Sequence, residues 1–231
     1  MKKTIIVTGA SGNMGQAVVK KFLTEKYHVV GTIIPNDPVS LEINDERLEK
    51  VAVNLMSESD SQKFVQSVIE KNKTIDAAVL TVGGFVMNKI ADTPAEDILK
   101  QYKLNFETAY NVARPVFVQM MKQGYGRIFL VGSRPGLDVS RHGKGMVAYS
   151  LAKSLIFRLS ELMNAEAKDQ NVVASVIVPS TIDTTQNRKS MPDADFESWV
   201  KPEDIANAIY YYCTEEAAAL REPVIKLYNK A

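Results

Sequence analysis

Near its amino terminus the chain passes from a short apolar run, Thr4-Ile5-Ile6-Val7, directly into the glycine-rich segment Thr-Gly-Ala-Ser-Gly-Asn-Met-Gly at positions 8–15. A β-branched run without polar alternation is typical of a strand that is buried on both faces of a parallel sheet. Apolar residues then recur at helical spacing through position 22. A strand, a glycine turn and a helix in this order predict a dinucleotide-binding unit, in which the N–H groups that start the helix face the phosphates.

The three glycines of this turn have separate expected roles. Gly9 permits the tight turn, Gly12 lets the backbone approach a pyrophosphate, and Gly15 lets the helix pack close to the sheet. The turn does not end in Gly-Lys-Ser/Thr, which disfavours a loop for nucleoside triphosphates. A glycine turn that holds no ligand is the remaining alternative.

Further apolar runs follow the first and are separated by helical stretches. Strands that alternate with helices indicate βαβ crossovers, which build a parallel sheet covered on both faces. We therefore predict one domain over residues 1–231 with a doubly wound, Rossmann-type α/β fold of about seven strands. Helices are expected to begin at Thr93-Pro94, with Thr93 as the N-cap, and at Lys201-Pro202. The expected later strands are 29–34, 51–53, 77–80, 128–131, 172–178 and 224–227.

Charge and cysteine content disfavour several classes of function. Lys and Arg total 28 against 27 Asp and Glu, a net charge of +1, so we expect no general attraction to nucleic acid or to an anionic membrane. Cys213 is the single cysteine and is expected to be a buried structural thiol in a reducing cytoplasm. With two histidines besides, the chain has little material for a metal site, and none is predicted.

Tyr149 and Lys153 are the candidate reactive pair. Residues four apart share one face of a helix, so the ammonium would lie beside the phenol and favour the phenolate. A tyrosine that acts as a general acid or base works best when its pKa, normally near 10, approaches the operating pH. Lowering that pKa to near 7 requires about 4 kcal/mol of extra stabilisation of the anion. This requirement implies a second positive charge, which an oxidised nicotinamide ring would provide.

With the glycine turn and this pair, the sequence resembles the short-chain dehydrogenase/reductase family over essentially its whole length. The resemblance implies an enzyme that transfers a hydride between NAD(P)(H) and a carbonyl, alcohol or imine substrate. Tyr149 would be the acid/base and Lys153 would lower its pKa and hold the nicotinamide ribose. Ser133 would orient the substrate oxygen, and Asn105 would kink its helix and hold a relay water. The implied cofactor contacts, besides Tyr149 and Lys153, are Gly9, Ser11, Gly12, Asn13, Met14, Gly15, Thr32, Asn54, Leu55, Gly83, Gly84, Pro179, Ile182 and Thr184.

Three features depart from the family pattern. The glycine spacing is Thr-Gly-x-x-Gly-x-x-Gly, positions 81–84 read Thr-Val-Gly-Gly instead of Asn-Asn-Ala-Gly, and the loop between Ser133 and Tyr149 is longer than usual. Because that loop borders the substrate, the identity of the substrate stays open. NAD and NADP both stay open as cofactors, since neither an acid nor a base stands near Thr32 at the end of the second expected strand.

Residues 179–200 lack clear periodicity and follow an expected strand end, so we predict that they form a lid over the substrate. Positions 183–199 resemble the matching segment of the dihydropteridine reductases, which makes reduction of a pterin a specific alternative. A non-catalytic regulator that senses a dinucleotide is a second alternative, although such proteins often lose the tyrosine or the lysine. The resemblance also implies a homodimer or homotetramer formed through the helices around 104–121 and 149–163.

Overall fold

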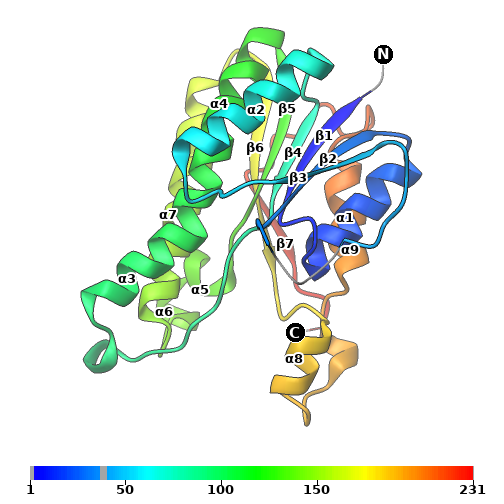
Figure 1. The fold of residues 1–231 in the computed structure, drawn as a ribbon. Coiled ribbons are helices and arrows are strands. Elements are labelled where there is room, and N and C mark those ends of the chain that lie inside the picture. The colour runs from blue at the N-terminus through cyan, green and yellow to red at the C-terminus, as the bar shows by residue number, and fades with distance from the viewer. Residues whose placement is uncertain (1–2, 37–40, 231) are drawn as a thin grey trace.

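Seven strands form one parallel sheet in the computed structural model, which describes residues 3–36 and 41–230 (Figure 1). Their order, β3-β2-β1-β4-β5-β6-β7, places β1 beside β4 and reverses the direction of winding between them. In such a sheet the loops at the carboxyl ends of these two strands open the crevice that binds a ligand. The predicted doubly wound fold is confirmed, and each expected strand overlaps an observed one, although β3 begins at Leu48 instead of position 51. The strands are β1 (Thr4–Thr8), β2 (His28–Ile33), β3 (Leu48–Ala52), β4 (Ala77–Leu80), β5 (Tyr125–Val131), β6 (Asn171–Pro179) and β7 (Val224–Leu227).

Helices cover both faces of the sheet. On one face lie α1 (Asn13–Thr24) and α9 (Pro202–Tyr211), and on the other lie α2 (Glu58–Asn72), α4 (Thr108–Gln123) and α7 (Val147–Glu166) (Figure 1). Side chains of β1 alternate between the two sides, because successive residues of a strand point to opposite faces. Ile5 and Val7 pack in the core under α1 and α9, whereas Ile6 packs in the core under α2, α4 and α7. Double-sided burial explains why β1 lacks polar alternation.

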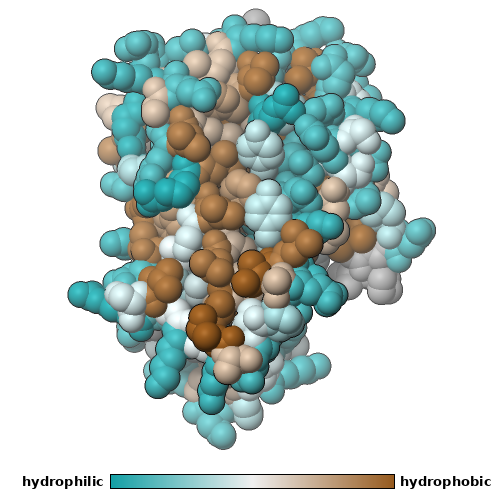
Figure 2. All heavy atoms as spheres, turned by 90° about the vertical axis from the view of Figure 1, so that its left-hand side faces the viewer, coloured by the Kyte–Doolittle hydropathy of each residue, from teal (hydrophilic) through white to brown (hydrophobic). Residues whose placement is uncertain are grey.

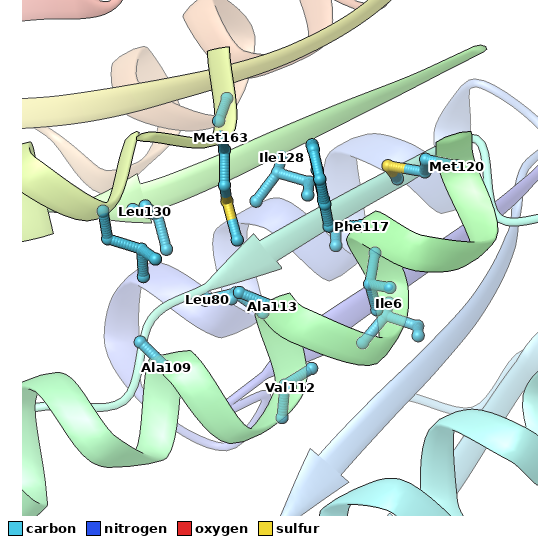
Figure 3. Close-up of a cluster of buried hydrophobic side chains, with 14 of the residues drawn as sticks. Ile6, Leu80, Ala109, Val112, Ala113, Phe117, Met120, Ile128, Leu130 and Met163 are labelled. Atoms are coloured by element: carbon cyan, nitrogen blue, oxygen red, sulfur yellow. The ribbon is translucent and has the colours of Figure 1, made fainter. Parts of the chain in front are cut away.

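The larger core joins α4 and α7 to the centre of the sheet, and Figure 3 shows its side chains. Phe117 and Met120 of α4 and Met163 of α7 pack with Ile128 and Leu130 of β5. Burying such a side chain fully contributes about 1.5 to 3 kcal/mol. This core fixes β5 and α7 relative to each other. Ser133 follows β5 and Tyr149 lies in α7, so the core also positions these two site residues.

The predicted helix starts are confirmed in one case and wrong in detail in the other. α9 begins with Pro202 at its first position, as expected. α3 (Ala95–Tyr102) begins after Pro94, and Thr93 does not cap it. The Thr93 hydroxyl donates instead to the Lys89 carbonyl oxygen at 2.7 Å, across the 3₁₀ turn η1 (Ile90–Asp92). This local hydrogen bond competes with capping, as it commonly does for threonine.

The predicted lid contains two short helical segments, α8 (Thr185–Ser190) and η3 (Phe196–Ser198). The guanidinium of Arg188 donates to both carboxylate oxygens of Asp183, at 2.6 and 2.8 Å, and lies 4.6 Å from the Phe196 ring centroid. Trp199 closes the segment and is buried. In Figure 1, α8 lies at the bottom of the view, and α5 (Arg134–Leu137) and α6 (Val139–His142) lie at the lower left, beside α3.

Three further observations concern thiol, metal and membrane chemistry. Cys213 is buried, and burial raises the pKa of its thiol to about 12, so the thiol is neutral and structural as predicted.

Within residues 3–36 and 41–230 no group of three or more His, Cys, Asp or Glu side chains is placed to hold a metal ion. In the same part of the chain no helix has the length and apolarity that crossing a bilayer requires.

Candidate active site

The glycine turn after β1 has the geometry that its sequence predicts. Gly9 has a φ of +62°, in the left-handed region that glycine adopts without steric cost. A Cβ on Gly15 would lie 2.1 Å from the carbonyl oxygen of Gly9, so only glycine lets the first turn of α1 lie against the loop. Gly12 is the N-cap of α1 and is exposed, which leaves the space before the first N–H groups of the helix free of a side chain.

A second glycine-containing segment follows β4 and lies beside this turn. The Thr81 hydroxyl donates to the Thr8 carbonyl oxygen at 2.6 Å, and the Thr81 N–H donates to the Thr8 hydroxyl at 3.1 Å. Two hydrogen bonds therefore connect the carboxyl ends of β1 and β4. This is the point where the winding of the sheet reverses, so the two segments line one crevice.

Asn105 holds the loop after β4 to the helix layer. Its Nδ2 donates to the Gly84 carbonyl oxygen and its Oδ1 accepts the Gly84 N–H, both at 3.1 Å, and its side chain is buried. Asn105 stands in η2 (Lys103–Glu107), a π-helical segment between α3 and α4. Single π turns often occur at functional sites, because the wider turn redirects a side chain. The resemblance predicted a distorted helix at Asn105, and the structure has one.

Ser133 and Tyr149 are in direct contact. Ser133 follows β5 and is the N-cap of α5, where its hydroxyl accepts the Gly136 N–H at 3.1 Å. The same side chain is hydrogen-bonded to the phenol of Tyr149 in the first turn of α7. The structure thus brings together two predicted site residues that are distant in sequence.

Lys153 lies on the same face of α7 as Tyr149, as the four-residue spacing predicts. Its Nζ is 6.0 Å from the centroid of the Tyr149 ring and donates to the Val131 carbonyl oxygen at 2.8 Å. A Cβ on Gly83 would lie 3.3 Å from this Nζ and 2.6 Å from the Asn105 Oδ1. The four predicted catalytic residues therefore lie together at the carboxyl edge of the sheet, next to the segment that adjoins the glycine turn.

Burial dominates the acid–base behaviour of this pair. It lowers the pKa of Lys153 to about 8. It raises the pKa of Tyr149, and the hydrogen bond from Ser133 offsets this only in part. In the protein alone, desolvation of the phenolate outweighs the interactions that favour it, so Lys153 by itself does not make the phenol acidic. A further positive charge is needed at the site, as the sequence argument requires.

The backbone of the crevice fits a dinucleotide. Gly12 and Asn13 at the start of α1 and Gly83 in the loop after β4 are exposed, whereas all residues of β1 and β4 are buried. Backbone groups are therefore accessible just beyond the point where these two strands end. The unblocked helix start at Gly12 suits a pyrophosphate, since helix N–H groups and the helix dipole favour an anion. A side chain at Gly83 would displace Asn105, so the loop stays open beside Lys153.

The residues expected near the adenosine part of the cofactor give no charge that selects NAD or NADP. Thr32 is buried, and its hydroxyl accepts the Gly9 N–H at 3.3 Å. Positions 32–36 read Thr-Ile-Ile-Pro-Asn, and the next acid, Asp37, lies outside the described residues. Asn54 is exposed, whereas Leu55 is buried with its carbonyl oxygen bonded to Asn111. Neither a carboxylate that would repel a 2′-phosphate nor a base that would bind one occurs at positions 32–36, 54 or 55.

Of the predicted contacts from the lid, Thr184 lies close to the start of α1. Pro179 ends β6, and Ile182 pairs with Val200 in an isolated parallel bridge. Thr184 caps α8 by accepting the Asn187 N–H at 3.1 Å. Thr184 and Asn13 line one polar cavity of about 460 Å³. Two other predicted contacts are less accessible, because the Met14 side chain is packed in the core and Ser11 is buried.

Phe85 is a site residue that the sequence argument did not identify. Its ring centroid lies 5.0 Å from that of Tyr149 with the ring planes at 83°, an edge-to-face contact. The contact arises because Asn88 pairs with Met146, which brings the loop after β4 beside the start of α7. No sequence pattern relates positions 85 and 149, because only this tertiary pairing joins them.

A glycine turn at the switch point of the sheet, with Ser133, Tyr149 and Lys153 gathered beside it, defines the class of dinucleotide-dependent oxidoreductases built on a Rossmann-type fold. The family model described as short chain dehydrogenase matches residues 3–195, and the chain belongs to this family. The match confirms the predicted class, an NAD(P)-dependent short-chain dehydrogenase/reductase.

Named relatives of this chain have several functions. A 3-oxoacyl-(acyl-carrier-protein) reductase of Buchnera aphidicola is 23% identical and covers 94% of this chain and 92% of its own length. A cyclic-di-GMP-binding biofilm dispersal mediator protein of Escherichia coli is 24% identical, with 94% and 91% covered. A dihydropteridine reductase of Dictyostelium discoideum is 25% identical, with 93% and 89% covered. The solved structure of gox2181 superposes with a TM-score of 0.86 at 22% identity, covering 99% of this chain and 95% of that one, and supports the fold.

Proposed function

We propose that the protein transfers a hydride between NAD(P)(H) and the carbon of a carbonyl, alcohol or imine substrate, with Tyr149 as the general acid/base. The observation that supports this most is the contact set of the Tyr149 side chain, with Ser133 hydrogen-bonded to the phenol and Lys153 on the same helix face. These side chains stand at the edge of the crevice where the fold places a dinucleotide. A regulator that only binds a dinucleotide has no need of this arrangement.

Each residue then has a distinct task in reduction. The cofactor supplies the hydride that the substrate carbon receives. The Gly9–Gly15 turn and the start of α1 bind the pyrophosphate, and Lys153 donates hydrogen bonds to the nicotinamide ribose. Ser133 orients the substrate oxygen or nitrogen, and Tyr149 donates its proton to that atom as the carbon receives the hydride. The raised pKa of Tyr149 keeps the phenol protonated in the free protein, in the form that reduction requires.

Turnover with reduced dinucleotide tests this proposal. We expect the purified protein to oxidise NADH or NADPH only when a carbonyl or imine substrate is present, as followed by the loss of nicotinamide absorbance. The panel contains ketones, aldehydes and quinonoid dihydropterin, each with both dinucleotides. Tight dinucleotide binding in calorimetry without turnover of any compound would contradict the proposal and favour the regulator.

Pterin reduction is the more specific alternative within the same chemistry. The resemblance of residues 183–199 to dihydropteridine reductases supports it, and so does the Dictyostelium relative. Turnover confined to quinonoid dihydropterin in the same panel would select this alternative. The name of the Escherichia coli relative describes a binding protein. Dinucleotide binding is therefore measured separately from turnover.

We also propose that the protein forms a homodimer or homotetramer through α4 and α7. Figure 2 shows apolar residues running down the face that these helices contribute to. Several large apolar side chains on these two helices are well exposed. Large exposed apolar patches on soluble proteins commonly mark interfaces, which supports the proposed assembly. These side chains are Tyr110, Val118, Leu151, Leu155 and Leu162.

Leu155→Glu is expected to reduce the mass of the particle in light scattering to that of one chain, because a carboxylate at an apolar interface is costly to bury. Leu155 is 38% exposed. The matched control is Leu220→Glu, at a leucine 39% exposed outside these helices, which should keep the mass of the unmodified protein. A monomer mass for the unmodified protein would refute the proposed assembly.

A further inference from the structure

We propose that Phe85 contacts the substrate and that it stacks a planar, conjugated ring of that substrate beside Tyr149. This inference rests on the proposed function, because it places the ring relative to the phenol that transfers the proton. It assigns a substrate class, namely carbonyl or imine compounds whose reacting carbon is part of a planar conjugated ring or attached to one.

The exposure of Phe85 is the first observation that supports this proposal. A phenylalanine side chain is usually buried, yet Phe85 is 62% exposed, and Met87 in the same loop is 61% exposed. An edge-to-face contact with Tyr149 covers only part of the Phe85 ring. The rest of the ring is available to a ligand, at the residue that carries out the proposed proton transfer.

The loop that carries Phe85 is held on both sides, so the ring is presented in a defined position. Before it, the N–H and the carbonyl oxygen of Gly84 are both bonded to Asn105. After it, the Asn88 carbonyl oxygen accepts the Val147 N–H at 3.4 Å, and the Asn88 side chain donates to Asp97 at 3.2 Å. An exposed aromatic ring on an anchored loop suits recognition, because little conformational entropy is lost when a ligand binds.

The geometry of the two rings favours a flat substrate group. Aromatic rings prefer offset-stacked or edge-to-face contacts, and such pairs are favourable beyond the apolar area that they bury. A planar ring against the free part of Phe85 makes this contact and directs a substituent toward Tyr149. A saturated ring of the same size is puckered and has no π face, so it retains only the apolar burial.

Matched pairs of compounds separate these two cases. Acetophenone and cyclohexyl methyl ketone have the same carbon skeleton and differ in the planarity of the ring, so their kcat/KM values with NADH and NADPH are compared. Benzamide and cyclohexanecarboxamide form a non-reacting pair, whose dissociation constants are measured by ligand-observed NMR with the oxidised dinucleotide bound. The unmodified protein, Phe85→Leu and the control Ile90→Ala are measured in parallel. Ile90 is an apolar side chain 80% exposed in the following turn.

We expect the unmodified protein to prefer the aromatic member of each pair and Phe85→Leu to lose about 2- to 12-fold of that preference. Ile90→Ala should keep the preference, and all three proteins should bind dinucleotide alike. Equal binding of the two carboxamides to the unmodified protein, or an equal loss for both members in Phe85→Leu, would overturn the assignment. If no compound of the whole panel is turned over, the proposed function fails, whereas the carboxamide pair still decides whether Phe85 selects a planar ring.

Discussion

Tyr149→Phe is expected to lower kcat by about 10²- to 10⁴-fold, the range that a positioned general acid or base contributes. The substitution removes only the hydroxyl, so the ring contact with Phe85 and the packing of α7 should remain. Dinucleotide affinity should change little, because the glycine turn and Lys153 are untouched. Single-turnover kinetics on the best substrate of the panel measure the effect, since they separate the chemical step from product release.

An exposed tyrosine elsewhere in the fold provides the control for this substitution. Tyr211→Phe removes a hydroxyl from α9, where the side chain is 48% exposed, and should leave kcat unchanged. Unchanged turnover in Tyr149→Phe would contradict the proposed proton transfer. Circular dichroism would show whether a loss of turnover in Tyr149→Phe comes from loss of the folded state. In that case Ser133→Ala tests the proposed proton transfer instead, because Ser133 is hydrogen-bonded to the Tyr149 phenol.

Lys153→Met is expected to lower turnover by about 10²- to 10³-fold, which is typical when one preorganised electrostatic contact to the reacting groups is removed. It should also weaken dinucleotide binding, because the ammonium is the proposed donor to the ribose. The variant should nevertheless fold, since Lys153 is buried with one hydrogen bond, to the Val131 carbonyl oxygen, and methionine retains the apolar part of its packing.

The same variant tests the low pKa of Lys153 through the pH dependence of stability. Below about pH 8 the lysine is charged in both the folded and the unfolded chain, and the folded protein bears the cost of burying that charge. Between about pH 8 and the unfolded value of 10.5 the unfolded chain binds more protons, so stability rises with pH. The rise attributable to Lys153 is about 3 kcal/mol at most.

Urea unfolding of the protein without added dinucleotide measures this effect between pH 7 and 10. We expect the unfolding free energy of the unmodified protein to gain on that of Lys153→Met as the pH rises. Cys213, whose pKa is raised by burial, titrates alike in both proteins and cancels in the difference. Lys168→Met, at an exposed lysine, should show no such divergence. Parallel pH profiles for Lys153→Met and the unmodified protein would show that the buried ammonium carries no such penalty.

Much of the architecture follows from local sequence. Strand β1 is predictable because Ile5, Ile6 and Val7 are apolar on both faces, and the turn is predictable because Gly9 and Gly15 stand where no side chain fits. The shared face of Tyr149 and Lys153 follows from the period of the α-helix. The hydrogen bond of Thr93 does not follow from local sequence, because a threonine hydroxyl can cap the following helix or bond to a preceding carbonyl oxygen, and the 3₁₀ turn before it favours Lys89.

The sequence alone specified a buried parallel sheet, a glycine turn suited to a phosphate, and a tyrosine and a lysine on one face of a helix. Hydrophobic periodicity and the steric requirements of glycine act over a few neighbouring positions, so they can be read from the chain. Tertiary structure alone decided that Phe85 contacts Tyr149 and that the pKa of Tyr149 is raised instead of lowered. Both outcomes depend on which side chains from separate elements surround the phenol. Desolvation and ring contacts arise from that three-dimensional neighbourhood, to which no local spacing gives access.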